Sequence, residues 1–217
     1  MKKIFFSISV FLITQNIFAQ NNVFGYGLKA GISVGKIEML PPLENRTEHY
    51  GLGIVAGGSV QIPIHKKFKI QIESLYNLHL FSNEFKNTDL YTDAKKIDLS
   101  LHQVSVPVWL GYFIVPKWSI NAGVSANYNF YFKEKASLDY GASPNTFYPT
   151  FNITDQITKF QPGVLAGTTF YVTDNISIDS RYHRMLTNSY KRPPGDNWTE
   201  YHHGFFQIAL GYKFRNL

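Results

Sequence analysis

Hydrophobic residues alternate with small or polar ones along most of the chain. From Phe24 to Gly35 the even positions are apolar, while glycine, serine and lysine occupy the odd positions. Successive side chains of a β-strand point to opposite faces, so this pattern predicts a strand with one apolar face. The same alternation recurs in seven further segments, at residues 50–62, 68–80, 104–114, 118–132, 160–172, 176–186 and 206–214.

The connections between these segments alternate between short and long. The short ones are residues 63–67, 115–117 and 173–175, and the long ones lie near residues 37–48, 82–98, 133–158 and 190–203. Short turns at one end and long loops at the other are the plan of an outer-membrane barrel, and an even strand number lets the first strand pair with the last. We therefore predict an all-β fold, an eight-stranded antiparallel up-and-down transmembrane β-barrel with short periplasmic turns and long outer loops.

The distribution of charge predicts which face of the strands meets lipid. Even positions within the strands carry only Lys36 and Arg184, both toward the long-loop end, whereas odd positions carry Lys29, Lys69, Glu73, Lys159, Asp179, Arg181 and Lys213. A lysine or arginine facing lipid at the bilayer midplane costs about 2–4 kcal/mol. The even face is therefore predicted to be the lipid face. A soluble ligand-binding barrel would show the reverse arrangement.

Aromatic residues on the even face support this orientation. They gather at the short-turn end (Phe24, Tyr26, Phe68, Tyr112, Trp118, Phe170, Tyr212 and Phe214) and toward the long-loop end (Tyr50, Tyr76, Tyr128, Phe130, Phe132, Phe160 and Phe206). Two aromatic girdles around an aliphatic band are typical of a barrel that spans a bilayer. Pro107 and Pro162 interrupt the pattern, because neither can donate a ladder hydrogen bond, and we expect a bulge or kink at each.

The first 19 residues have the features of a secretory signal peptide. Lys2 and Lys3 precede a short apolar core, and Ala19 offers a small residue at the cleavage point. We therefore predict a signal peptide at residues 1–19 and a single barrel domain at residues 20–217. Cleavage would remove two of the 21 Lys and Arg residues and leave 19 against 15 acids, a surplus too small to indicate nucleic-acid binding. The chain has no cysteine, which excludes disulfides, thiolate zinc sites and cysteine nucleophiles.

The order and content of the strand segments resemble a known family. The resemblance covers nearly the whole predicted mature chain and rests on the segments FGYGLKAGISVG, FKIQIESLYN, HQVSVPVWLGYF, WSINAGVSANYNF, ISIDSRYHRML and FQIALGYKF. These segments resemble the PorT-type outer-membrane β-barrel family, small eight-stranded barrels of Gram-negative bacteria. The namesake serves type IX protein secretion, so the resemblance implies an accessory role in such a machine as one alternative. The chain departs from the usual aromatic terminus of outer-membrane barrels, since three residues follow Phe214.

The odd face predicts a packed polar lumen, because eight strands leave an interior just wide enough for side chains to fill. Within it, Lys29, Glu73, Asp179 and Arg181 lie at similar distances from the short-turn ends of their strands, and we predict that they form a neutral charge cluster. Buried charges must be paired, so a structural role is the leading interpretation of this cluster, with a proton or ion path as the alternative.

No spacing assembles a catalytic set. His183 has no serine two residues later, His102 and Ser105 fall on opposite strand faces, and the neighbouring His202 and His203 point apart. We predict no enzyme activity, no cofactor and no metal site, and keep an outer-membrane lipid-modifying enzyme as the less favoured alternative. The basic turn formed by His65, Lys66 and Lys67 is interpreted as a solvated periplasmic turn, with an acidic partner as the alternative.

The long loops carry aromatic and arginine side chains, which are common at interfaces but can also pack on the barrel rim. The candidate contact residues are Tyr148, Arg192, Trp198 and Tyr201. The predicted function is that of a non-enzymatic integral protein of a Gram-negative outer membrane, with a structural or partner-binding role through its extracellular loops. Its expected partners are outer-membrane lipid, the barrel-assembly machinery during insertion and an envelope protein.

Overall fold

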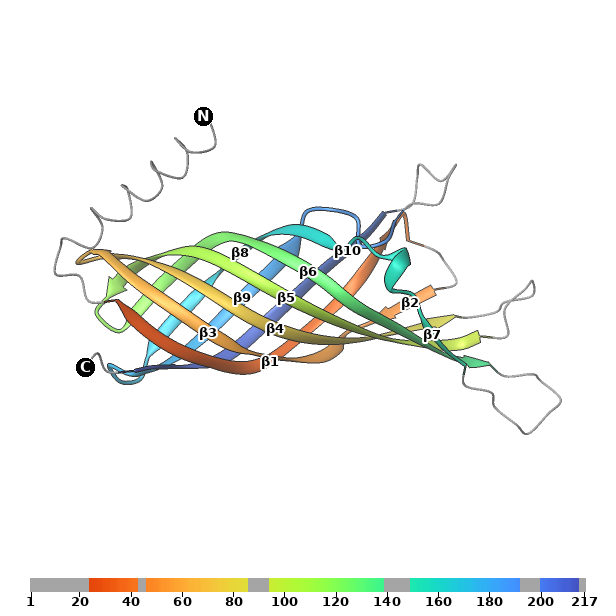
Figure 1. The fold of residues 1–217 in the computed structure, drawn as a ribbon, viewed down its shortest axis with the longest axis horizontal. Helices are drawn as coiled ribbons and strands as arrows, with labels where there is room; N and C mark the ends of the chain where they lie inside the picture. Colours follow the sequence, from red (N-terminus) through yellow and green to blue (C-terminus); the bar gives the residue numbers. More distant parts are fainter. Residues whose placement is uncertain (1–23, 43–45, 86–93, 139–148, 192–199, 215–217) are drawn as a thin grey trace, which may run out of the picture.

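The computed structural model describes residues 24–42, 46–85, 94–138, 149–191 and 200–214, and it confirms the predicted barrel. Eight long antiparallel strands form a closed ring (Figure 1). In ring order they are β1 (Gly25–Leu40), β3 (Gly51–His65), β4 (Phe68–Phe85), β5 (Ala94–Val115), β6 (Trp118–Leu138), β8 (Phe160–Tyr171), β9 (Ile176–Met185) and β10 (Glu200–Lys213). Among the described residues, no helix has the length and apolar character needed to cross a membrane.

The first and last strands of the ring pair with each other, as the even strand number predicts. The register of β1 with β10 is continuous from Gly27 opposite Lys213 to Leu40 opposite Glu200. On its other side β1 pairs with β3, and the β4–β5 pairing completes the circle. Every strand of the ring thus has two hydrogen-bonding neighbours, which removes the unpaired edges that an open sheet would present.

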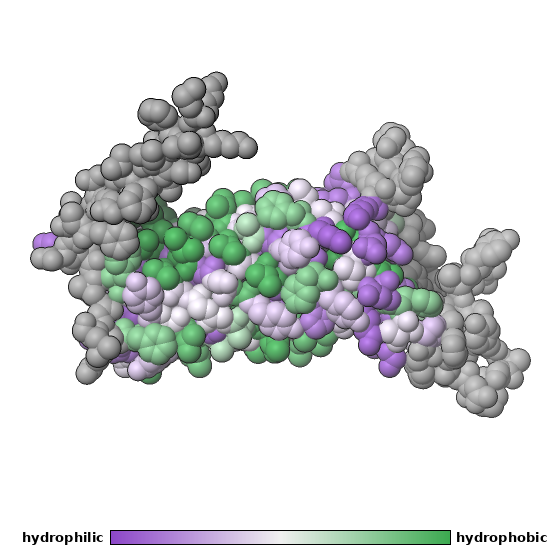
Figure 2. Space-filling model, viewed as in Figure 1, coloured by the Kyte–Doolittle hydropathy of each residue, from purple (hydrophilic) through white to green (hydrophobic). Residues whose placement is uncertain are grey.

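The two faces of the wall divide as the charge pattern predicts. Leu28 and Leu210 on the even face are 57% and 60% exposed, while the charged odd-face residues Lys29, Glu73 and Asp179 are at most 3% exposed. Figure 2 shows hydrophobic side chains along the barrel wall and hydrophilic ones gathered toward the end at which β2 (Arg46–His49) and β7 (Thr150–Asn152) lie. The wall is therefore apolar where it would contact lipid and polar at one end.

The strands at this end extend further than the alternation predicts. β5 and β6 have 22 and 21 residues, and the segments predicted as long loops also contain the short strands β2 and β7 and the 3-10 helix η1 (Thr154–Gln156). The physical reason is that the wall no longer faces lipid there. Outward side chains such as Lys96 and Asp98 are charged, so the apolar period of two disappears although the ladder continues.

Phe132 does not belong to the outer aromatic girdle, so its predicted position is wrong. The β5–β6 register shifts between His102, opposite Tyr131, and Gln103, opposite Asn129, which places an extra residue in β6. One extra residue moves the following side chains to the other face. Phe132 is consequently buried inside the barrel, at 1% exposure.

The two prolines cause no bulge. Pro107 lies opposite Ser125 and Pro162 opposite Ala126 in uninterrupted registers with β6. On the β4 side, the pairing with β5 omits the positions facing Val106 and Pro107 but resumes in the same register. The missing N–H donor of Pro107 is therefore accommodated by a short gap in one ladder, and the expectation of a bulge is wrong.

Candidate functional site

The structure brings the four predicted lumen charges into contact. Lys29 lies on β1, Glu73 on β4, and Asp179 and Arg181 two residues apart on β9. The Lys29 ammonium lies 2.5 Å from a Glu73 carboxylate oxygen and 2.9 Å from an Asp179 oxygen. Arg181 bridges the same two acids at 2.9 Å each. Two bases and two acids thus form a closed, electrically neutral ring of contacts across the lumen.

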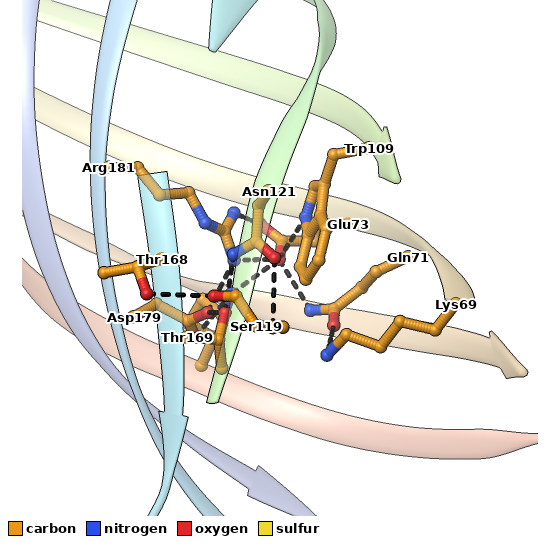
Figure 3. A network of polar contacts seen from close by, with 11 residues as sticks. Lys69, Gln71, Glu73, Trp109, Ser119, Asn121, Thr168, Thr169, Asp179 and Arg181 are labelled. Carbon is orange, nitrogen blue, oxygen red and sulfur yellow. Dashed lines mark hydrogen bonds and ion pairs between the residues drawn. The ribbon is translucent and has the colours of Figure 1, made fainter. Parts of the chain in front are cut away.

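Glu73 is the shared acceptor of this cluster (Figure 3). The two terminal guanidinium nitrogens of Arg181 donate to it, one to each carboxylate oxygen, at 2.9 Å. The Gln71 amide and the Trp109 indole also donate to Glu73, at 2.7 and 3.1 Å. The guanidinium of Arg181 lies over the Trp109 ring, 4.5 Å from its centroid. This arrangement satisfies a buried carboxylate that would otherwise be costly to remove from water.

Asp179 is held by side chains of the neighbouring strands β8 and β6. The Thr169 hydroxyl donates to it at 2.5 Å, and the Asn121 amide in turn donates to the Thr169 oxygen at 2.7 Å. All four charged residues are at most 3% exposed. The cluster is neutral and enclosed, and each of its charged groups is paired, although the Arg181 Nε has no hydrogen-bond partner. Such a geometry suits a structural core.

The sequence pattern places Lys69 and Trp109 on the inner face but does not reveal their roles. Trp109 contributes both a hydrogen bond to Glu73 and an aromatic face to Arg181. Lys69 lies beyond the cluster, toward the short-turn end, and its ammonium contacts the Gln71 amide oxygen at 3.5 Å. Their odd positions were the only sequence signal, and the contacts depend on register between distant strands.

A layer of buried histidines lies on the other side of the charge cluster. His79, His183 and His203 surround Phe205, with ring centroids of His79 and His183 each 4.5 Å from that of Phe205. The Ser33 hydroxyl lies 3.3 Å from Nδ1 of His79, a serine–histidine contact between strands that sequence spacing could not show. The other ring nitrogen of His79 has no hydrogen-bond partner, and Ser33 is 2% exposed. The pair therefore lacks both an orienting acid and access to a substrate.

An apolar cap fills the outer end of the lumen. It comprises the buried side chains Ile37, Phe81, Leu99, Leu101, Phe132, Ile153 and Ile157. The last two flank η1, which brings the segment after β7 over the barrel mouth, and Ile157 forms a bridge with Tyr190. Burial raises the pKa of the Tyr190 phenol, which packs against Phe132 in an edge-on contact. The described interior is thus filled from the charge cluster to this cap.

Of the four candidate loop contacts, only Tyr201 can be placed. It packs on the rim. Its ring centroid lies 4.7 Å from that of Tyr190 and 5.6 Å from the Arg46 guanidinium carbon. Tyr148, Arg192 and Trp198 lie outside the described residues. Within the described part of the chain, no three His, Asp or Glu side chains are placed to hold a metal ion.

Comparisons with known proteins agree with this architecture. A family model described as outer membrane protein beta-barrel domain matches residues 18–191. Neisserial surface protein A is 14% identical in sequence, with 87% of this chain and 97% of that protein covered and a TM-score of 0.50, which shows a shared fold.

Two further structures are similar at lower scores. Ail, the attachment invasion locus protein of Yersinia pestis, solved with the heparin analogue sucrose octasulfate, is 15% identical over 88% of this chain and 99% of Ail, with a TM-score of 0.49. OprG of Pseudomonas aeruginosa is 11% identical over 90% of this chain and 98% of OprG, with a TM-score of 0.44. No curated protein sequence matches this chain.

Proposed function

Because the chain belongs to the outer membrane protein β-barrel domain family of Gram-negative outer membranes, we propose that it is a non-enzymatic barrel. We further propose that it binds a protein partner through its outer rim. The filled lumen carries this proposal. The neutral charge cluster, the histidine layer and the apolar cap occupy the interior of the described barrel, so the accessible polar surface lies at its ends.

At the rim, the wall of the barrel extends beyond the membrane. A transmembrane strand needs about 9–11 residues, whereas β5 and β6 have 22 and 21, so about half of each stands beyond the hydrocarbon layer. Figure 1 shows the ends of β4, β5 and β6 projecting past the rest of the ring. The exposed Lys96–Asp98 ion pair, at 3.3 Å, lies on this projection. A projecting, charged sheet is suited to contact another protein.

Photo-cross-linking in intact cells tests this proposal. A photoreactive phenylalanine in place of Asp98 probes the rim, and the same residue in place of Leu210 probes the lipid face as a matched control. We expect a discrete protein adduct from position 98 and only lipid adducts from position 210. Absence of a protein adduct at position 98 and at further rim positions would contradict the proposal.

The two alternatives have distinct outcomes. The resemblance to PorT-type barrels supports an accessory secretion role, which requires the adduct at position 98 to be a component of a secretion machine. A lipid-modifying enzyme instead requires that deletion of the gene changes the mass of lipid A. The second result would contradict a non-enzymatic role directly.

We also infer that residues 1–19 are removed on export and that residues 20–217 form one domain. The charged start and small residue at Ala19 support this inference, and the first described strand begins at Gly25, shortly after that point. The intact mass of the protein extracted from outer membranes tests it. We expect a mass that corresponds to a chain beginning at Gln20.

A further inference from the structure

A cavity of about 450 Å³ lies at the short-turn end of the barrel, opposite the rim. Its lining comes from the turns after β3, β5 and β8 together with the adjoining strand ends. Five basic side chains line it, and Asp174 is the single acidic residue among its lining residues. The basic residues are His65, Lys66, Lys69, Lys117 and Lys213.

Lys69 lies at the inner end of this cavity and is 4% exposed. Its ammonium is surrounded by aromatic rings, 4.6 Å from the centroid of Tyr171 and 4.8 Å from that of Trp109. Apart from these rings, its polar contact is the Gln71 amide oxygen at 3.5 Å. Among the described residues, no carboxylate forms an ion pair with Lys69.

The charge cluster leaves Lys69 uncompensated. Glu73 and Asp179 already pair with Lys29 and Arg181, two negative charges against two positive ones. A protonated Lys69 is therefore a surplus positive charge in a buried position, where an unpaired charge is costly. The hydroxyl of Tyr171, which lines the same cavity, is buried without a hydrogen-bond partner.

We propose that this cavity binds an organic carboxylate, whose oxygens contact the Lys69 ammonium and the Tyr171 hydroxyl. A negative group supplies the missing charge, and a carboxylate accepts from both donors. The other walls include Phe68, Phe113, Pro63 and Pro116, which are apolar and would pack on a carbon skeleton. The carboxylate could be that of a small free acid or of a periplasmic peptide, and the site is separate from the rim of the proposed function.

Benzoate and its neutral analogue benzamide test the need for charge. The readout is the indole N–H resonance of Trp109, which lies against Lys69, in the full barrel in detergent micelles. We expect a saturable shift with benzoate and none with benzamide, while the lipid-facing Trp118 indole stays unchanged. Equal responses to both compounds, no response to benzoate, or an equal response to inorganic phosphate would overturn the proposal.

Three substitutions separate binding from folding. Lys69→Met keeps an apolar stem but removes the charge, and we expect it to abolish the benzoate shift. Lys67→Met changes the neighbouring turn outside the cavity lining and should bind as the wild type does. Tyr171→Phe removes a hydroxyl that has no partner, so it should weaken benzoate binding several-fold without lowering thermal stability. Unchanged affinity in both Lys69→Met and Tyr171→Phe would also overturn the proposal.

Binding measurements with peptides identify the source of the carboxylate. A short peptide with a free carboxyl terminus is compared with the same peptide as its terminal amide. Tighter binding of the acid form than of benzoate assigns the cavity to a periplasmic peptide, and binding no tighter than benzoate assigns it to a small acid.

Discussion

Glu73 accepts hydrogen bonds from more side chains than any other residue of the charge cluster. It accepts from Lys29, Gln71, Trp109 and Arg181, side chains contributed by four different strands. Removing its charge would leave both bases facing Asp179 alone. Breaking one partner of a buried ion pair costs about 3–5 kcal/mol, because the remaining charge stays buried without compensation.

We therefore expect Glu73→Gln to lower markedly the temperature at which the barrel loses its heat-modifiable gel mobility. Glu84→Gln is the matched control, because Glu84 is half-exposed in an ion pair with His49 and should change this temperature little. Adding Arg181→Met to Glu73→Gln restores neutrality and should recover part of the loss. An unchanged transition in Glu73→Gln would show that the cluster is not a structural core.

Gly167 provides a second test of the same core, through packing. A Cβ at this position would lie 2.2 Å from the Ser180 carbonyl oxygen and 2.7 Å from the Arg181 Cα. We expect Gly167→Ala to destabilise the barrel by about 1–3 kcal/mol by pushing the β9 backbone away. At Gly58 the nearest atom to an added Cβ is 3.8 Å away, so Gly58→Ala should leave the thermal transition nearly unchanged. Equal effects of the two substitutions would contradict this explanation.

Single residues also show the limit of sequence-based prediction. The period of two places Glu73 and Arg181 inside the barrel, because odd and even positions along a strand point to opposite faces of the wall. The same parity places Lys69 inside but cannot reveal that it lacks an acid, since that depends on which side chains Glu73 and Asp179 already contact. The pairing of Ser33 with His79 likewise follows from register between strands and is absent from any local motif.

At the scale of elements, the number and direction of the strands are predictable. The length of the strands at the outer end, and the face to which their side chains point there, are not. Lipid enforces the apolar alternation only where the wall crosses the membrane, so the projecting parts of β5 and β6 leave no such pattern. The bulge in β6 has a similar cause. It follows from pairing with β5 and moves Phe132 from the predicted girdle into the cap.

The closing strand pair carries a prediction about assembly. The Phe214 amide donates to the Tyr26 carbonyl at 2.8 Å, and its ring packs edge-on against Tyr212 on the outer face. If the assembly machinery reads this aromatic end of β10, Phe214→Ala should lower the yield of folded barrel in outer membranes several-fold. Deleting Asn216 and Leu217 should lower it less. A larger loss from the deletion would place the signal at the chain terminus instead.

At the scale of the whole molecule, the filled lumen predicts that the barrel is not an ion channel. Purified protein in planar bilayers should show no conductance steps above those of membranes that receive detergent alone. The charge cluster blocks the middle of the barrel, and the apolar cap fills its outer end. Stable, protein-dependent conductance steps would contradict this picture of a packed interior.

The barrel is filled unevenly along its axis, and this has a consequence for exchange with its surroundings. The cap fills the end that faces outward in the predicted orientation, while the cavity beside Lys69 opens at the other end. The barrel thus contains a cavity that is open at one end only, rather than a channel that is open at both ends. A solute that enters the cavity must leave through the same mouth, so its occupancy follows its concentration on that side of the membrane, and the barrel itself gives it no passage to the other side.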